Sequence, residues 1–211
     1  MSTRIEIYNA ALIRLGERRL ATLSDNRPER RSLDAVWADT LAYMIEAAMW
    51  NWAARTEELQ SSDTVTPNFG YTYAFEKPDD YVRIVRIADN ELLGPTLEDY
   101  IEEGDYFFAW GDPLYLQYIS NDTDYGADPG KWTASFSRAF VLELAYRVAP
   151  QVGVNAKLQE LLYEEKNRAL SYAKSKDVVN QAMTRLPAGR LIGSRMGRGY
   201  RDPAGTPPWR R

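Results

Sequence analysis

The stretch that decides the fold runs from Pro28 to Ala54 and reads PERRSLDAVWADTLAYMIEAAMWNWAA. Its large apolar side chains recur at spacings of three and four residues, which places them on one face of an α-helix. Pro28 suits a first helical turn, and Asp25 and Asn26 before it are residue types that cap helices. We therefore predict a helix over residues 28–54. Its apolar face consists of Leu33, Val36, Trp37, Leu41, Met44, Ile45, Ala48, Met49 and Trp52.

This predicted helix is not stable by itself. Burying one large apolar side chain contributes roughly 1.5–3 kcal/mol, whereas ordering each backbone residue costs about 1–2 kcal/mol. The rest of the chain must therefore supply a surface for the apolar face. Trp52 is in phase with that face, so Trp50, two residues earlier, is predicted to contact a sheet or another subunit instead.

Three further helices are predicted, over residues 3–16, 133–149 and 155–182. Thr3 and Glu6 have capping-box spacing, and Gly16 suits the end of the first helix. The third helix is apolar on most faces and is expected to end at Pro150 and Gly153. Asn155 is the expected cap of the fourth.

Residues 70–120 alternate between aromatic or β-branched residues and polar ones, which predicts antiparallel strands that form a small sheet. The turns are expected at 77–80 and 121–130. The predicted fold class is α+β, mainly helical, with a four-helix body, a small antiparallel sheet and an extended C-terminal arm. The domain spans residues 1–184 and the arm residues 185–211.

Composition limits the chemistry. The 211 residues contain neither cysteine nor histidine, which excludes histidine-based nucleophile systems and the usual zinc sites. No run approaches the roughly 20 apolar residues that span a bilayer, and the start lacks the apolar run of a secretory signal peptide. We expect no catalytic residues, no cofactor, no metal and no membrane partner.

The net charge of −4 is unevenly distributed. The Gly- and Pro-rich segment 185–211 has seven Arg, no Lys and one Asp, a net charge of +6, and the remaining residues carry −10. Such an arm is expected to bind an acidic surface, of which another copy of the chain is the simplest. Its predicted partner-binding residues are Arg190, Arg195, Arg198, Tyr200, Arg201, Trp209, Arg210 and Arg211.

Three groups of residues suggest other chemistry. Asp122, Asp124 and Asp128 share a loop but do not match the calcium-loop template, so we interpret them as a solvated turn. The acids at 98–105 either form an acidic surface or contain a catalytic carboxylate pair, with Glu102 and Glu103 as first suspects. The Gly- and Arg-rich arm lacks the P-loop pattern, although it suits nucleic acid as well as protein.

Several stretches together resemble a known family. They read N-A-A-L-I-R-L-G at 9–16, L-x-D-x-R-P-E at 23–29, W-N-W-A-x-R at 50–55 and Y-x-Y-A-F-x-x-P-x-D-Y-V-R-I at 71–84. With the two later helices and the arm, the chain is similar over most of its length to the tail tubular protein A family of short-tailed, T7-like bacteriophages. The motifs are structural, not catalytic.

The resemblance implies a head-to-tail adaptor of the virion tail, made in the host cytoplasm. Such proteins form a homo-oligomeric ring of twelve copies between the portal and the nozzle, tail tubular protein B. Tail fibres dock near this ring, and DNA passes through its lumen without specific binding. Two alternatives of other classes are a carboxylate-dependent cell-wall glycan hydrolase and a nucleic-acid-binding protein that acts through the arm.

Overall fold

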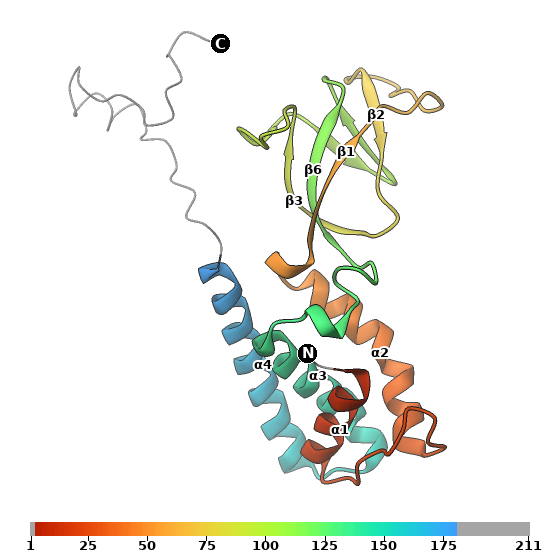
Figure 1. The fold of residues 1–211 in the computed structure, drawn as a ribbon, viewed down its shortest axis with the longest axis vertical. Coiled ribbons are helices and arrows are strands. Elements are labelled where there is room, and N and C mark those ends of the chain that lie inside the picture. Colours follow the sequence, from red (N-terminus) through yellow and green to blue (C-terminus); the bar gives the residue numbers. More distant parts are fainter. Residues whose placement is uncertain (1–2, 181–211) are drawn as a thin grey trace, which may run out of the picture. The chain divides into compact units, whose positions relative to one another are not determined.

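The computed structural model describes residues 3–180, which contain four α-helices and six strands (Figure 1). The helices are α1 (Arg4–Leu15), α2 (Pro28–Glu46), α3 (Ala134–Val152) and α4 (Ala156–Val179). The strands are β1 (Ala54–Leu59), β2 (Tyr73–Glu76), β3 (Tyr81–Ala88), β4 (Ile101–Glu103), β5 (Tyr106–Ala109) and β6 (Leu114–Ser120). The predicted α+β class is confirmed, while the predicted arm at 185–211 lies outside the described residues.

Helix ends follow the predicted caps in most places. Thr3 and Glu6 form a reciprocal capping box at the start of α1, and Gly16 ends it in the left-handed region at φ 78°. Asn155 caps α4 through the N–H of Leu158, as expected. Gly153 ends α3 in the left-handed region at φ 78°, as expected. However, the helix continues through Pro150 to Val152, because a proline in the last turn removes only one helical hydrogen bond and its φ suits a helix.

The main correction concerns α2, which ends at Glu46 and not at Ala54. The chain then forms a turn and a short 3₁₀ helix, η1 (Asn51–Ala53), and enters β1. In a continuing helix the N–H of Asn51 would donate to the carbonyl of residue 47, but here it donates to the carboxylate of Asp177 at 2.9 Å. A partner 126 positions along the chain therefore replaces the helical acceptor.

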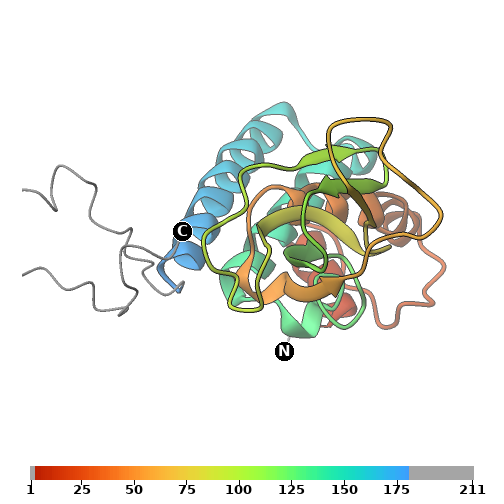
Figure 2. The same ribbon diagram turned by 90° about the horizontal axis from the view of Figure 1, so that it is seen from above.

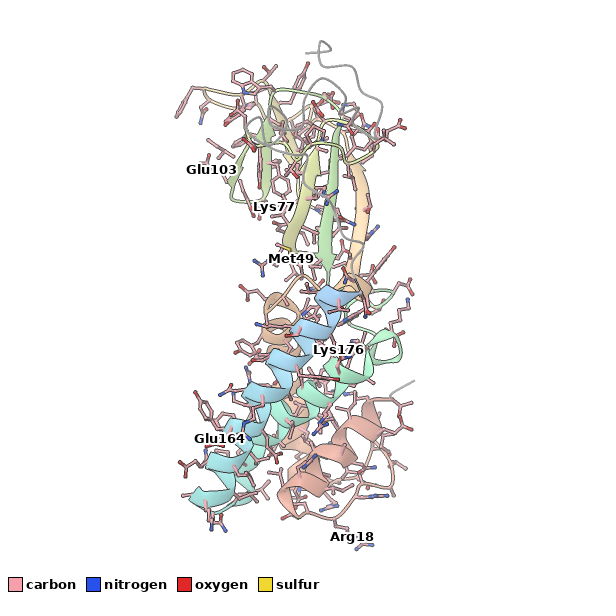
Figure 3. All side chains as sticks on the ribbon, turned by 90° about the vertical axis from the view of Figure 1, so that its left-hand side faces the viewer. Arg18, Met49, Lys77, Glu103, Glu164 and Lys176 are labelled. Atoms are coloured by element: carbon pink, nitrogen blue, oxygen red, sulfur yellow. The ribbon has the colours of Figure 1, made fainter. Side chains whose placement is uncertain are left out.

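This early end reverses two predictions about burial. Trp50 is fully buried and donates its indole N–H to the carbonyl of Met44 at 2.8 Å, whereas Met49 is 43% exposed (Figure 3). Trp52 is only half-buried. The start of α2 also differs, because Arg27 occupies the N-cap position and neither Asp25 nor Asn26 caps the helix.

The four helices lie side by side as one group, with α3 in contact with each of the other three (Figures 1 and 2). The centre of this group is aromatic. The ring of Trp37 lies 5.0 Å from Phe140 and 5.3 Å from Tyr8, both in edge-to-face geometry. Trp37 thus connects α2 to α1 and α3, which explains why a helix with this apolar face organises the others.

One buried ion cluster joins α3 to α4. The side chain of Glu143 is only 6% exposed and accepts from Arg147 at 2.9 Å and from Lys166 at 3.0 Å. Removing one partner from such a cluster leaves a charge in a poorly hydrated site. Glu143 therefore fixes how these two helices pack.

The strands form two antiparallel sheets where a single sheet was predicted, with orders β1-β6-β3 and β2-β5-β4. Strands β1 and β4 were not predicted. A second core contains apolar side chains from both sheets, namely Leu59, Phe75, Ile87, Phe107, Ala109, Leu114, Leu116 and Tyr118. Strand β6 also contributes Ile119 to the helical core, so one strand belongs to both cores.

Trp50 and Met49 test where α2 ends. We expect Trp50→Ala to lower the free energy of unfolding by about 3–5 kcal/mol, because it empties a fully buried site. Met49→Ala, on an exposed neighbour, should change it by less than about 1 kcal/mol. Urea denaturation measures both, and the opposite ranking would mean that α2 continues to Ala54.

The buried ion cluster makes a second prediction. Glu143→Gln keeps the shape of the side chain but removes the charge that faces Arg147 and Lys166, so it should cost about 3 kcal/mol. The matched control Glu164→Gln breaks a pair with Arg168 on the surface of α4 (Figure 3) and should cost less than about 1 kcal/mol. Thermal and urea unfolding of both variants would contradict this prediction if the two costs were equal.

Candidate interaction surfaces

A polar network holds the strands together where they meet the helices. Asp80, in the turn before β3, accepts hydrogen bonds from Arg55 of β1 at 2.9 Å and from Tyr118 of β6 at 2.9 Å. It also accepts one from the hydroxyl of Ser120. Since the side chain of Asp80 is only 14% exposed, these bonds replace most of its contact with water. Three separate segments thus depend on one carboxylate.

Asp80, which joins the strands, and Asp177, at the end of α4, have pKa values shifted in opposite directions. Burial alone would raise the pKa of Asp80, but hydrogen bonds from Ser120, Tyr118 and Arg55 outweigh burial and lower that pKa below its ordinary value. For Asp177, burial dominates over the single hydrogen bond from the N–H of Asn51, and the pKa is raised. Asp80 is therefore held as a carboxylate by its partners, while Asp177 is the more easily protonated of the two.

The structure places the excess negative charge in one region. Residues 54–120, which include all six strands, contain 14 acidic and four basic residues, a net charge of −10. The other described residues, 3–53 and 121–180, contain 15 of each and are neutral overall. Moreover, no Lys or Arg occurs between Arg86 and Lys131. Within the described residues, the excess negative charge therefore lies in the strand region and not in the helices.

One face of the sheet β2-β5-β4 points away from the second core. The register pairs Tyr106 with Glu76 on one side and Glu103 on the other, and it pairs Phe108 with Ala74 and Ile101. Successive strand residues point to opposite faces, so the buried Phe75 and Phe107 face the second core, while Glu76, Tyr106 and Phe108 lie on the opposite face. Ala74 shares that face but is only 1% exposed. We call this outer surface the aromatic face. It consists of Glu76, Ile101, Glu103, Tyr106 and Phe108, with the buried Ala74 beneath it.

Exposed aromatic residues continue beyond the strands. Trp110, directly after β5, is 54% exposed, and its ring centroid lies 5.2 Å from that of Tyr71. Both side chains donate to the carboxylate of Asp99 at 2.9 Å. Trp110 is thus exposed and Tyr71 half-exposed, and partly exposed aromatic side chains held in place by hydrogen bonds are typical of interfaces. This surface has no signal in the periodicity of the sequence, because only the register brings it together.

The proposed carboxylate pair is not assembled by the strand. Glu102 and Glu103 are consecutive residues of β4, so their side chains point to opposite faces. Glu102 forms an ion pair with Lys77 at 2.8 Å, and Glu103 lies on the aromatic face (Figure 3). The geometry therefore gives no support to a pair of carboxyls that flanks a glycosidic bond.

In the 121–130 turn, two of the three aspartates accept hydrogen bonds from backbone N–H groups of the same turn. Asp122 accepts from the N–H of Asp124 at 3.0 Å, and Asp128 accepts from the N–H of Gly130 at 2.8 Å. Asp124 pairs with Lys131. Across residues 3–180, no group of three or more acidic side chains gathers closely enough to hold a metal ion.

The eight predicted partner-binding residues of the arm, from Arg190 to Arg211, all lie outside the described residues, so their role stays a prediction. No protein-family model matches the chain, and no curated protein matches it either. Within the described range, no helix combines the length and apolar character that a membrane crossing requires.

Asp80 makes a prediction about pH. Its folded-state pKa is lowered, so its contribution to stability is present above the unfolded pKa of about 4 and is lost as pH falls through the folded value. Asp80→Asn should cost about 1–3 kcal/mol at pH 7, and the difference from the native chain should shrink below pH 4. Urea denaturation at several pH values measures it. With Glu103→Gln as the exposed control, a difference that does not change with pH would contradict the assignment.

Proposed function

We propose that this chain is a structural head-to-tail adaptor of a bacteriophage, a ring protein between portal and tail nozzle. The observation that carries the proposal is that two motifs behind the resemblance meet in space. Arg55, from W-N-W-A-x-R, donates to Asp80, from P-x-D-Y-V-R-I, across 25 residues of sequence. Both motifs thus contribute to one tertiary contact, which supports treating them as parts of a single fold.

The other motifs also lie at helix ends and at a turn between strands. N-A-A-L-I-R-L-G covers the second half of α1 and its glycine cap, and L-x-D-x-R-P-E leads into α2. The long aromatic motif covers β2, the turn after it and the start of β3. These residues maintain a fold and do not form a reactive site, which favours a structural role.

Charge separation within one chain supports assembly from identical copies. A strand region of net charge −10 and a terminal segment of +6 are different surfaces that attract each other between copies. Contacts between two different surfaces repeat around a rotation axis and close into a ring when the rotation allows it. The number of copies, twelve, follows from the resemblance alone.

In this proposal the ring contacts the portal on one side and tail tubular protein B on the other, with tail fibres nearby. It resides in the portal-proximal tail of the virion. DNA passes through the lumen, whose acidic residues repel the phosphates so that the genome slides without sticking. The hydrolase alternative would need carboxyls that converge, and Glu102 and Glu103 do not.

Deleting residues 185–211 tests the proposal. The truncated chain should remain folded by circular dichroism but stay monomeric and fail to co-purify with the portal protein of the same phage, because the deletion removes seven Arg. Light scattering of both chains, alone and mixed with portal, measures this. Normal assembly by the truncated chain would contradict the role of the arm. Salt-dependent DNA binding that is lost on truncation would favour the nucleic-acid alternative.

A further inference from the structure

We infer that the aromatic face binds the arginine-rich segment 185–211 of a second copy of the chain. The inference deepens the proposed function and rests on it for the assembly of copies. What it adds is the site itself, an outer sheet surface whose residue types and spacing suit arginine side chains. It also assigns the strand sheet β2-β5-β4, and not the helical group, as the receiving surface.

The centre of the face suits a guanidinium group. Tyr106 lies between Glu76 and Glu103 on the two neighbouring strands, and such cross-strand pairs hold their Cβ atoms about 4.5–5.5 Å apart. A cation above the Tyr106 ring would therefore meet a carboxylate on either side. Neither glutamate forms an ion pair within residues 3–180, so both are available for a partner.

The neighbouring row is apolar. Phe108, which is half-buried, lies between the buried Ala74 and Ile101, which is 48% exposed. The rings of Tyr106 and Phe108 are parallel to within 1°, with centroids 6.5 Å apart. Arginine stacks its planar guanidinium on aromatic rings and packs its methylene stem on apolar surface, whereas the more strongly hydrated lysine does so less well.

The terminal segment has the matching composition. Residues 185–211 supply seven Arg and no Lys, with Tyr200 and Trp209 as aromatic anchors. The 31 residues after Asn180 span at most about 100 Å when extended, which is several times the radius of a domain of this size. The segment is thus long enough to reach a neighbouring copy, and its charge complements the region that contains the face.

Photo-crosslinking of the full chain tests the inference. A benzophenone-bearing phenylalanine replaces Phe108 in ¹⁵N-labelled protein, which is mixed with unlabelled protein and irradiated. Mass spectrometry should find crosslinks from position 108 to unlabelled peptides of residues 185–211. The same probe in place of Leu23, an exposed residue between α1 and α2, should give no such crosslinks.

Matched charge variants then test the chemistry of the face. Glu76→Gln with Glu103→Gln should lower the yield of these crosslinks about tenfold, because two carboxylates are lost beside Tyr106. Glu58→Gln with Glu91→Gln removes the same charge near Tyr115 on the other sheet and should leave the yield unchanged. Equal losses in both pairs would overturn the site, since they would reflect overall charge alone.

The remaining outcomes separate this inference from the proposed function. Rings seen by light scattering without crosslinks to 185–211 would overturn the inference and leave the adaptor proposal standing. Crosslinks confined to peptides of the same labelled copy would overturn the contact between copies. A chain that stays monomeric both alone and with portal would overturn both.

Discussion

The junction between α2 and β1 is the constraint on which the rest of the structure depends. Asn51 is held by its N–H to the carboxylate of Asp177 and by its side-chain amide to the carbonyl of the same residue. These bonds tie the end of α4 to the segment in which α2 has ended, Trp50 is buried and β1 is about to begin. Since the last turn of α4 provides both acceptors, the end of the described chain fixes the geometry of its first third.

This dependence explains how far the sequence could be used to predict the fold. The starts of α1 and α4 were predicted correctly because each N-cap residue, Thr3 or Asn155, directly precedes the helix that it caps. The end of α2 was not, because its partner Asp177 is distant in sequence, and the apolar spacing continues through Met49 and Trp52. Capping and periodicity patterns describe contacts between residues close in sequence. The Asn51–Asp177 hydrogen bond joins residues far apart in sequence, so these patterns carry no sign of it.

Sequence-based prediction was limited in the same way for the strands and for the aromatic face. Alternation predicted β2, β3, β5 and β6, but β1 and β4 consist largely of charged residues, which carry little strand signal. The aromatic face depends on the register of β4 with β5, so no inspection of the sequence could have paired Tyr106 with Glu103. The overall charge asymmetry was visible in the sequence, whereas its confinement to residues 54–120 required the fold.

The acidic charge of the strand region also carries a cost. The strand region has fourteen carboxylates and only four basic groups, so the carboxylates repel one another. Within the described chain only a few of them, such as Glu102 with Lys77, have a cation nearby. A cationic partner would relieve this repulsion, so charge that burdens the isolated chain becomes a driving force for association. Net charge of this kind also resists non-specific aggregation.

Strand β6 has a consequence for how the molecule comes apart. Its first residues, Leu114 and Leu116, belong to the core between the sheets, and Ile119, near its end, belongs to the core of the helices. Neither core can open fully without pulling a continuous backbone out of the other. The helical group and the sheets are therefore mechanically coupled along a covalent strand, and tension applied to the sheets is transmitted to the helices through peptide bonds.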